Sequence, residues 1–392
     1  MTTLKRTLGL PLLLLYGLGT ILGAGIYVLT GVVVAEAGEA APFAFFLAAV
    51  VAAPTAYSYS VLSAKYPQSA GEAVYVEKSF DRRWLTQCVG GLVVGVGIIS
   101  SATIARGFVG YLHVFVELPY WLVIPVLVVS LTGLAIVGVL ESVLVAGAIS
   151  VLEIGGLLLV IYGGFTFDEL RVVSVIPSMD STIWSGVLAG AFLAFYAFIG
   201  FEDIVNMAEE TRSPEKNLPY AILGSLGVAT VLYFLVAYIS VATVPISELA
   251  NHPAPMSYVV AQHGVFNPGF VALISMLAVV NGALVQVIMA SRVIYGVARM
   301  EDENHFLARI NPTTQTPTTA TILVGLAVLV LALLFDVRVL ASLTSAVTLA
   351  IFMVVNLSLC RLQGAPKSMM SFVPWLAVLL NGSLLVLALV NI

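Results

Sequence analysis

The sequence predicts an all-α polytopic membrane protein with about eleven transmembrane helices, of which the first and the sixth are discontinuous. Its composition is far from that of a soluble domain. Of the 392 residues, 60% are hydrophobic and 9% are charged, and the mean hydropathy is +1.07, whereas soluble domains carry roughly 25% charged residues. Apolar windows of about 20 residues, long enough to cross a bilayer as a helix, recur along the whole chain. Glycines interrupt two of these windows, which predicts the two discontinuous helices.

The apolar windows define eleven spans within one transmembrane domain, residues 1–392. The predicted spans lie near residues 8–35, 40–64, 85–112, 120–140, 143–163, 183–208, 218–243, 266–292, 317–335, 338–360 and 371–391. The first window is too long for a cleavable signal peptide and has no cleavage site, so we interpret it as a spanning helix.

The basic residues predict which side of the membrane each connection faces. With the N-terminus in the cytoplasm, cytoplasmic segments hold 13 of the 16 Lys and Arg residues: Lys5, Arg6, Lys65, Lys78, Arg82, Arg83, Arg212, Lys216, Arg292, Arg299, Arg309, Arg361 and Lys367. Such an excess is typical of cytoplasmic loops. We therefore expect a multi-pass protein of the cell membrane with a cytoplasmic N-terminus. Because the number of spans is odd, we expect an extracytoplasmic C-terminus.

The first span contains a cluster of glycines near its middle. Four of them stand within nine residues: Gly17, Gly19, Gly23 and Gly25. Glycine is a poor helix former, and unwound backbone at membrane depth is tolerated only where it lines a cavity or is buried in protein. An unwound segment exposes free amides next to the positive end of the following half-helix, which favours binding of a carboxylate.

A second interruption is predicted in the sixth span, where Gly200 precedes Glu202 and Asp203 in an otherwise apolar helix. Spans one and six begin two successive groups of five helices, residues 8–163 and 183–360, and the helix at 371–391 is additional. Five is an odd number, so the second group enters the membrane from the opposite side. Interrupted helices at matching positions of two inverted halves indicate a central binding site. Either glycine cluster alone is equally consistent with close helix packing.

Four segments, in order along the chain, resemble landmarks of the amino acid/polyamine/organocation (APC) permease superfamily. They read GTILGAGIY at 19–27, YPQSAGEAVY at 66–75, AEETRSPEKNLP at 208–219, and SRVIYGVAR at 291–299 followed by Thr316 and Pro317. The resemblance covers nearly the whole chain. It implies a LeuT-like inverted-repeat fold, alternating access, and a substrate bound midway across the bilayer.

The resemblance also implies which residues contact the substrate. The amides around Gly23, Ala24 and Gly25 would hold its carboxylate. Carbonyls near Thr20 and Ile21 and in the second break would receive its ammonium group. Tyr196 and Phe198 lie where the family places aromatic gates, although ordinary packing explains them as well. The complete predicted set is Thr20, Ile21, Gly23, Ala24, Gly25, Tyr196, Phe198 and Gly200.

The carboxyl groups inside the spans are candidates for ion coupling, because each charge at the bilayer centre costs at least about 2.5 to 3.5 kcal/mol. Glu153 lies midway along the fifth span, near a position where some relatives have a lysine linked to proton coupling. A structural role, hydrogen bonding to the unwound first helix, is the alternative. Glu202 and Asp203 are adjacent and point about 100° apart on an α-helix. We therefore expect at most one of them to face the substrate path.

Three further polar residues lie inside spans. We expect Arg106 to pair with a carboxylate or to line the outer vestibule. Asn281 and Gln286 offer neutral oxygens for a cation, and hydrogen bonding between helices explains them equally well.

The resulting hypothesis is a secondary active amino acid transporter that works as a proton-coupled symporter. An exchanger of amino acids or polyamines and a non-transporting amino acid sensor are the alternatives, and sodium is the alternative coupling ion. The sequence shows no cofactor or metal motif and no catalytic constellation, so we expect neither an enzyme nor a cofactor. Its basic residues do not indicate nucleic acid as a partner. The partners we expect are therefore an amino acid, a coupling ion and the lipid bilayer, with the oligomeric state open.

Overall fold

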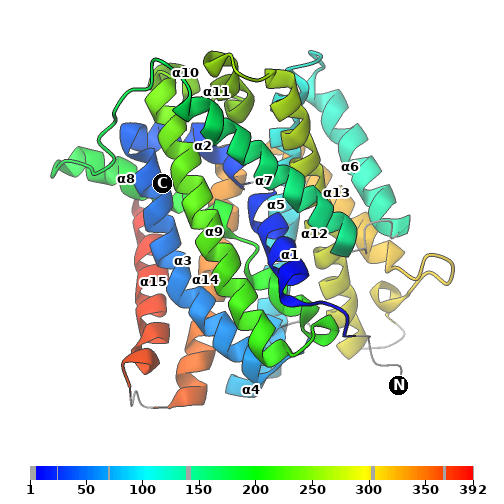
Figure 1. Ribbon diagram of the computed structural model, residues 1–392. Coiled ribbons are helices and arrows are strands. Elements are labelled where there is room, and N and C mark those ends of the chain that lie inside the picture. The colour runs from blue at the N-terminus through cyan, green and yellow to red at the C-terminus, as the bar shows by residue number, and fades with distance from the viewer. Residues whose placement is uncertain are drawn as a thin grey trace.

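The computed structural model describes residues 6–23, 25–68, 71–137, 143–301, 305–364 and 368–391. Regular structure in these ranges is helical, apart from one isolated bridge between Leu8 and Thr211. The long helices stand side by side as a bundle (Figure 1). The short helix α4 (Gly71–Phe80) lies at one end, which we call the α4 face. The helices α10 (Ile246–Leu249) and α11 (Pro255–His263) lie at the other end, the α11 face.

The crossings form two successive groups of five and one additional helix. The first group consists of α1 (Leu10–Leu22) with α2 (Gly25–Ala37), α3 (Ala41–Lys65), α5 (Arg83–Leu112), α6 (Tyr120–Val137) and α7 (Val143–Phe165). The second consists of α8 (Ser181–Phe195) with the 3₁₀ segments η2 (Tyr196–Phe198) and η3 (Glu202–Glu210), then α9 (Pro214–Thr243), α12 (Pro268–Glu301), α13 (Thr318–Leu334) and α14 (Val337–Gln363). The additional helix is α15 (Val373–Asn391).

These helices confirm the predicted fold class. Nine runs in the described residues are long and apolar enough to cross a membrane. One of them, Leu10–Lys65, contains two crossings, and the shorter apolar helix Thr318–Leu334 adds another. The first and sixth crossings are discontinuous, as predicted. The residue boundaries of the two repeats, 8–163 and 183–360, remain a prediction.

Two local predictions need correction. The segment after the second crossing, which the sequence presents as a loop, becomes the helix α4 at Gly71. The eighth crossing, predicted to end near residue 292, continues as α12 to Glu301. Both differences lie at the α4 face, where polar residues prolong helices beyond the apolar windows used for prediction. Hydropathy alone therefore underestimates the length of the helices at this face.

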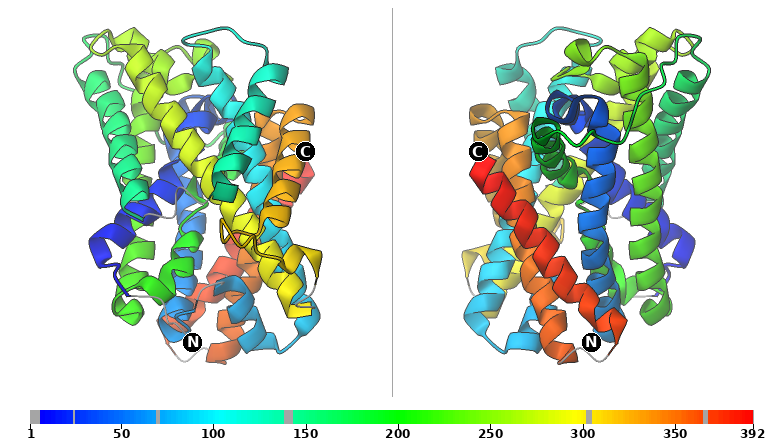
Figure 2. Two further views of the ribbon diagram at one scale, coloured as in Figure 1. Left: turned by 90° about the vertical axis from the view of Figure 1, so that its right-hand side faces the viewer. Right: turned by 90° about the vertical axis from the view of Figure 1, so that its left-hand side faces the viewer.

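The second group is inverted relative to the first. α1 starts near the α4 face, whereas α7 ends toward the α11 face and the chain enters α8 from that side (Figures 1 and 2). The broken crossings lie inside the bundle, where α2 packs against α8, and α1 packs against α9. The pairs α5 with α12 and α3 with α9 pack along each other around them.

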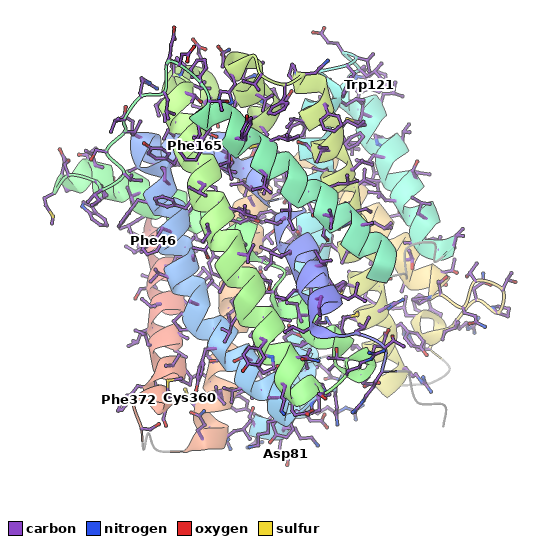
Figure 3. The ribbon with its side chains drawn as sticks, in the orientation of Figure 1. Phe46, Asp81, Trp121, Phe165, Cys360 and Phe372 are labelled. Carbon is purple, nitrogen blue, oxygen red and sulfur yellow. The ribbon has the colours of Figure 1, made fainter. Side chains whose placement is uncertain are left out.

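Large apolar side chains cover the outside of the bundle. Phe46, Trp121, Phe165 and Phe372 point away from it (Figure 3), and all four are exposed. An exposed apolar surface of this extent matches a lipid environment, since soluble monomers rarely expose such patches.

Buried amides hold the additional helix to the bundle. The Asn381 side chain on α15 and the Asn356 side chain on α14 each donate a hydrogen bond of 2.9 Å to the Thr55 hydroxyl oxygen on α3. All three side chains are buried. Polar contacts of this kind join helices where the surrounding lipid supplies no hydrogen bonds. They hold α15 against α3 and α14, as the right-hand view of Figure 2 shows.

Candidate functional site

The first break is short. α1 ends at Leu22, and the Gly23 N–H still donates to the Gly19 carbonyl oxygen at 3.1 Å, so Gly23 closes the first half-helix. α2 begins at Gly25. Ala24, predicted to contact the substrate, lies outside the described residues. The first amides of α2 are at the end of a half-helix, where backbone N–H groups have no partner within the helix.

The second break is longer and has a distinct backbone. After η2, Ile199 adopts an extended conformation (φ −62°, ψ 136°), and Gly200 has φ +125°. A residue with a side chain rarely adopts such a positive φ, so glycine is required here. The Glu202 carboxylate oxygen Oε2 accepts a 2.8 Å hydrogen bond from the Gly200 N–H. The acid therefore stabilises the break that precedes it.

The two breaks contact each other through their backbones. The Thr20 hydroxyl donates to the carbonyl oxygens of Gly17 and Gly200, both at 2.9 Å. A Cβ atom on Gly200 would lie 2.6 Å from the Thr20 carbonyl oxygen, and one on Gly25 would lie 2.2 Å from the Ala197 Cα. Gly25 and Gly200 are therefore required for this close approach.

Tyr233 on α9 joins the same two breaks. Its buried hydroxyl lies 2.7 Å from the Ile21 carbonyl oxygen and 2.9 Å from the Ala197 carbonyl oxygen, and it donates toward both. One carbonyl from each broken crossing is thus satisfied by a single phenol. Sequence reasoning missed Tyr233, because a tyrosine within an apolar span gives no local sign of the carbonyls that it meets.

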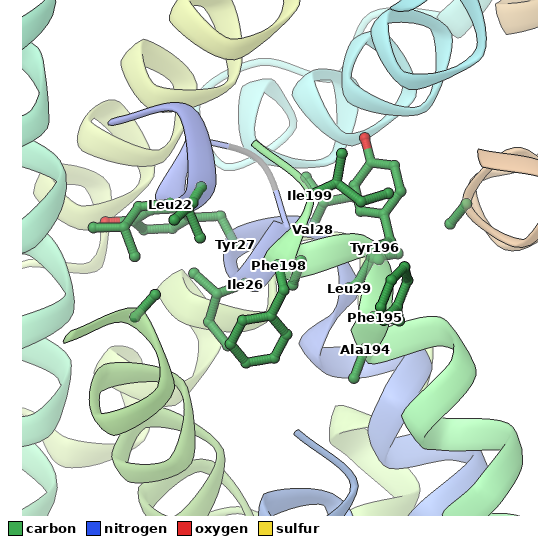
Figure 4. Close-up of a cluster of buried hydrophobic side chains, with 14 of the residues drawn as sticks. Leu22, Ile26, Tyr27, Val28, Leu29, Ala194, Phe195, Tyr196, Phe198 and Ile199 are labelled. Carbon is green, nitrogen blue, oxygen red and sulfur yellow. The ribbon is translucent and has the colours of Figure 1, made fainter. Parts of the chain in front are cut away.

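The two aromatic residues predicted as gates occupy different surroundings. The Tyr196 hydroxyl lies 3.0 Å from the Ser100 hydroxyl on α5. The Phe198 ring makes an edge-on contact with the Tyr233 ring, with centroids 5.0 Å apart and planes at 61°. Figure 4 shows the two side chains pointing in different directions from η2. Both are buried, so in this conformation each closes against a neighbouring helix.

Glu153 lies fully buried on α7, the fifth crossing. Its backbone carbonyl accepts a 2.6 Å hydrogen bond from the Tyr27 hydroxyl, and the Tyr27 carbonyl accepts one of 2.5 Å from the Tyr111 hydroxyl. Neither carboxyl oxygen has a hydrogen-bond partner in the described part of the chain. The Asn281 side chain is a polar neighbour, and an ionised Glu153 would act on the Tyr27 and Tyr233 hydroxyls. An acid with free oxygens therefore lies beside the residues that support both breaks.

Glu202 and Asp203 face the same small cavity, of about 30 Å³. The Gln286 side chain on α12 donates a 3.4 Å hydrogen bond to the Asp203 carboxylate. They line one cavity although adjacent residues of a 3₁₀ segment such as η3 point about 120° apart. The expectation that at most one of them faces the substrate path remains a prediction. A third acid, Glu72 on α4, lines the same cavity. Sequence reasoning missed Glu72, because its segment was interpreted as a loop.

Arg106 on α5 lies toward the α11 face and contacts backbone and an aromatic ring. Its guanidinium donates to the carbonyl oxygens of Phe335 at 2.9 Å and Leu333 at 3.3 Å, and it lies over the Tyr120 ring, 4.9 Å from the centroid. The predicted carboxylate partner is not among these contacts. Arg106 instead fixes the connection between α13 and α14.

A larger cavity, of about 280 Å³, lies between α8, α14 and α15. Phe192 and Leu387 contribute to its apolar walls, and Glu36 and Arg338, which form an ion pair, contribute charge. The cavity lies outside the contact between the breaks.

Comparison with known proteins identifies the family. The model of a family described as amino acid permease matches residues 8–392. The chain belongs to this amino acid permease family. The predicted resemblance to the APC superfamily is thereby confirmed.

The chain has several named relatives, among them a plant transporter and a bacterial permease. It is 29% identical over 379 residues to cationic amino acid transporter 3, mitochondrial, of Arabidopsis thaliana, a match that covers 91% of this chain and 62% of that protein. It is 28% identical over 383 residues to the branched-chain amino acid permease BcaP of Bacillus subtilis (strain 168), covering 92% of this chain and 82% of BcaP. The permease thus spans less than two thirds of the length of the plant relative.

A solved structure has the same fold. MhsT in complex with L-phenylalanine matches the permease with a TM-score of 0.65, covering 98% of each chain at 14% sequence identity. At this level of identity the match shows that the chain shares the fold of MhsT.

The first prediction concerns Gly200. We expect Gly200→Ala to destabilise the permease by about 1 to 3 kcal/mol, because its φ is unfavourable for alanine and the new Cβ would collide with the Thr20 backbone. Thermal unfolding in detergent measures this. The matched control is Gly227→Ala on α9, where a Cβ would meet nothing within 4 Å. Equal melting temperatures for the two variants would contradict the prediction.

The second prediction concerns Tyr233. Tyr233→Phe leaves the Ile21 and Ala197 carbonyls without their shared donor, and a buried polar group without a partner costs about 1 to 3 kcal/mol. We expect a lower melting temperature, whereas Tyr220→Phe on the exposed side of α9 should have no effect. An unchanged melting temperature for Tyr233→Phe would show that the bridge does not stabilise the breaks.

Proposed function

We propose that this permease is a secondary active transporter of amino acids that works by alternating access and takes up its substrate with a proton. The observation that carries this proposal is the contact between the two helix breaks, in which the Thr20 hydroxyl donates to the Gly200 carbonyl oxygen inside the bundle. Irregular backbone inside a membrane protein is a recurrent feature of transporter binding sites. The names of two relatives, a cationic amino acid transporter and a branched-chain amino acid permease, support amino acids as the substrate class.

The substrate would bind at the breaks. We propose that the amides around Gly23, Ala24 and Gly25 receive its carboxylate. The start of α2 presents N–H groups without helical partners and the positive end of a helix dipole, and the Gly23 N–H would exchange its bond to the Gly19 carbonyl for one to the substrate. The ammonium group would bind carbonyl oxygens near Thr20 and Ile21 and in residues 198–200. The Ile21 carbonyl already accepts from Tyr233, and the second lone pair of that oxygen remains for the substrate.

Tyr196 and Phe198 would open and close this site. The Tyr196 hydroxyl contacts Ser100 on α5, and the Phe198 ring contacts Tyr233 on α9. Movement of α8 relative to α5 and α9 would therefore displace both rings. This is consistent with a gate on the side of α8.

Glu153 would carry the coupling proton. A buried carboxyl with free oxygens is stable in the membrane as the neutral acid, and ionisation there requires a compensating change in its surroundings. Its backbone is tied to α2 through Tyr27, so rearrangement of the first break would alter its environment. Glu202 and Asp203 are the second candidates for coupling.

The proposed orientation places the α4 face in the cytoplasm of a cell whose plasma membrane contains the permease. Basic residues lie on this face: Lys65 ends α3, Lys78 is in the last turn of α4, and Arg82 directly precedes α5. An excess of basic residues is typical of the cytoplasmic side.

The function can be tested by uptake of labelled amino acids into proteoliposomes, with and without an imposed pH gradient. Accumulation that requires an inwardly directed proton gradient is the expected result. Uptake only into vesicles preloaded with an amino acid would show an exchanger. Binding without uptake would show a sensor and overturn the proposal. Replacing the proton gradient with a sodium gradient distinguishes the two coupling ions.

The third prediction concerns Glu153. Glu153→Gln preserves size and hydrogen bonding but cannot titrate. We therefore expect loss of gradient-driven accumulation, while exchange across the membrane persists without pH dependence. Paired uptake and exchange assays measure both activities. Glu169→Gln, at an exposed position after α7, is the control. Normal pH-dependent accumulation by Glu153→Gln would show that Glu153 is structural and would move the search to Glu202 and Asp203.

A further inference from the structure

Three acids from two separate segments meet on the α4 side of the second break. Glu72 comes from α4, whereas Glu202 and Asp203 begin η3. Their exposed fractions are 8%, 8% and 4%, so all three are more than nine-tenths buried. They line the cavity of about 30 Å³ described above. Burial of one acid is uncommon in proteins, and burial of three around one cavity needs a physical explanation.

Each acid has a different hydrogen-bond donor. The Tyr59 hydroxyl on α3 donates to Glu72 at 3.1 Å, the Gly200 N–H donates to Glu202, and the Gln286 amide donates to Asp203. All three donors are neutral groups, so none of them compensates a negative charge. Three ionised carboxylates in this position would repel one another at low dielectric.

The charges that act on the cluster come mainly from the cluster itself. An ionised Glu202 would feel Asp203 and Glu72, and an ionised Asp203 would feel Glu72. The other titratable groups that face the cluster are the phenols of Tyr59 on α3, Tyr75 on α4 and Tyr16 on α1. Arg292 on α12 is a cation at the edge of the cluster and acts on Tyr16 together with Asp203. The cluster therefore cannot be fully ionised while it is closed.

An independent observation indicates that the cavity holds a ligand. Thr348 on α14 also lines it, is 2% exposed, and its hydroxyl has no hydrogen-bond partner among the described residues. A hydroxyl can donate and accept, and a cavity of this size holds about one water molecule. In the described part of the chain, the carboxyl groups do not form a cluster suited to a metal ion. The ligand that fits is a proton shared among the acids, alone or on a water molecule.

We propose that Glu72, Glu202 and Asp203 form a proton-binding site, separate from Glu153, that keeps the α4 face closed while the site is protonated. The site joins two segments that are in close contact, because a Cβ on Gly71 would lie 2.4 Å from the Val205 Cγ2. Separation of α4 from η3 would admit water to the acids and allow them to ionise. Closing the two segments again would require a proton to return.

The sign of the pH effect follows from this linkage. Burial raises the pKa of Glu72, which lies outside the membrane-spanning helices. A carboxyl whose pKa is higher in the closed state stabilises that state at low pH, and this contribution is lost as the pH rises through the raised pKa. Opening of the α4 face should therefore increase with pH.

The fourth prediction tests this with a cysteine in the cavity wall. Val96 on α5 lines the cavity, so Val96→Cys in a Cys88→Ser, Cys360→Ser background reports opening by its rate of modification with a polar methanethiosulfonate reagent. The protein is purified in detergent without substrate. Each rate is divided by that of exposed Cys88 alone at the same pH, which removes the intrinsic pH dependence of thiol reactivity.

We expect the normalised rate to rise with pH, and Glu72→Gln to weaken the rise and delay it by on the order of one pH unit, because one of the repelling charges is gone. Glu77→Gln, on the exposed side of α4, should leave the profile unchanged, and Glu72→Asp should retain it. An identical profile for Glu72→Gln and Glu77→Gln overturns the proposal. If Glu72→Gln does not fold, Asp203→Asn takes its place in the assay. An unchanged pH profile for Asp203→Asn would then overturn the proposal.

The assay uses neither substrate nor a gradient, so its outcome does not depend on the transport hypothesis. Repeating it with Glu153→Gln separates the two acidic sites. A retained pH profile supports a distinct site at α4, whereas a lost profile assigns the proton to Glu153 and overturns the proposal. Failure of uptake in proteoliposomes would leave this result unaffected.

Discussion

The structure depends on one constraint: backbone polar groups inside a membrane must find partners within the protein. Two broken helices expose such groups, and here they find partners in the first broken crossing and in the neighbouring helix α9. Thr20 donates to the Gly200 carbonyl, and Tyr233 donates to one carbonyl from each break. The glycines at these positions allow the approach that makes these contacts feasible. A substrate with a carboxylate and an ammonium group could replace some of these contacts without leaving the backbone unsatisfied.

The same principle joins the two broken crossings at their α4 ends. The Leu8 N–H donates to the Glu210 carbonyl at 3.0 Å, and the Arg212 N–H donates to the Leu8 carbonyl at 2.9 Å. Leu8, two residues before α1, is therefore connected by backbone hydrogen bonds to the end of η3 and the segment that follows it. A movement of one of these half-helices toward opening would carry the other, or would break both bonds. The two broken crossings are thus connected at their α4 ends as well as by the contact at their breaks.

The sequence was sufficient for the spans, the breaks and the inverted arrangement, because hydropathy and glycine content are local signals. It was insufficient for the groups that complete the site. Tyr233 and Glu72 act through partners more than ten residues away in the chain, Ile21, Ala197 and Tyr59, and no local pattern identifies such partners. The cavity that Glu202 and Asp203 line was likewise not predictable, because its other walls come from distant segments, among them α4, α5 and α12. Local patterns predict where a helix is interrupted, and tertiary packing decides what the interruption contacts.

The acids differ in a way that separates their roles. Glu153 has free carboxyl oxygens next to residues that hold the breaks, so its environment changes when the first break changes. In the cluster, one oxygen of each acid is already held by a neutral donor, and the remaining interactions are among the acids themselves. The environment of the cluster changes when α4 separates from η3. Under the proposed function, a proton on Glu153 would respond to the substrate site and a proton in the cluster would respond to the closure of the α4 face, so that one transport cycle would couple protonation to two different movements.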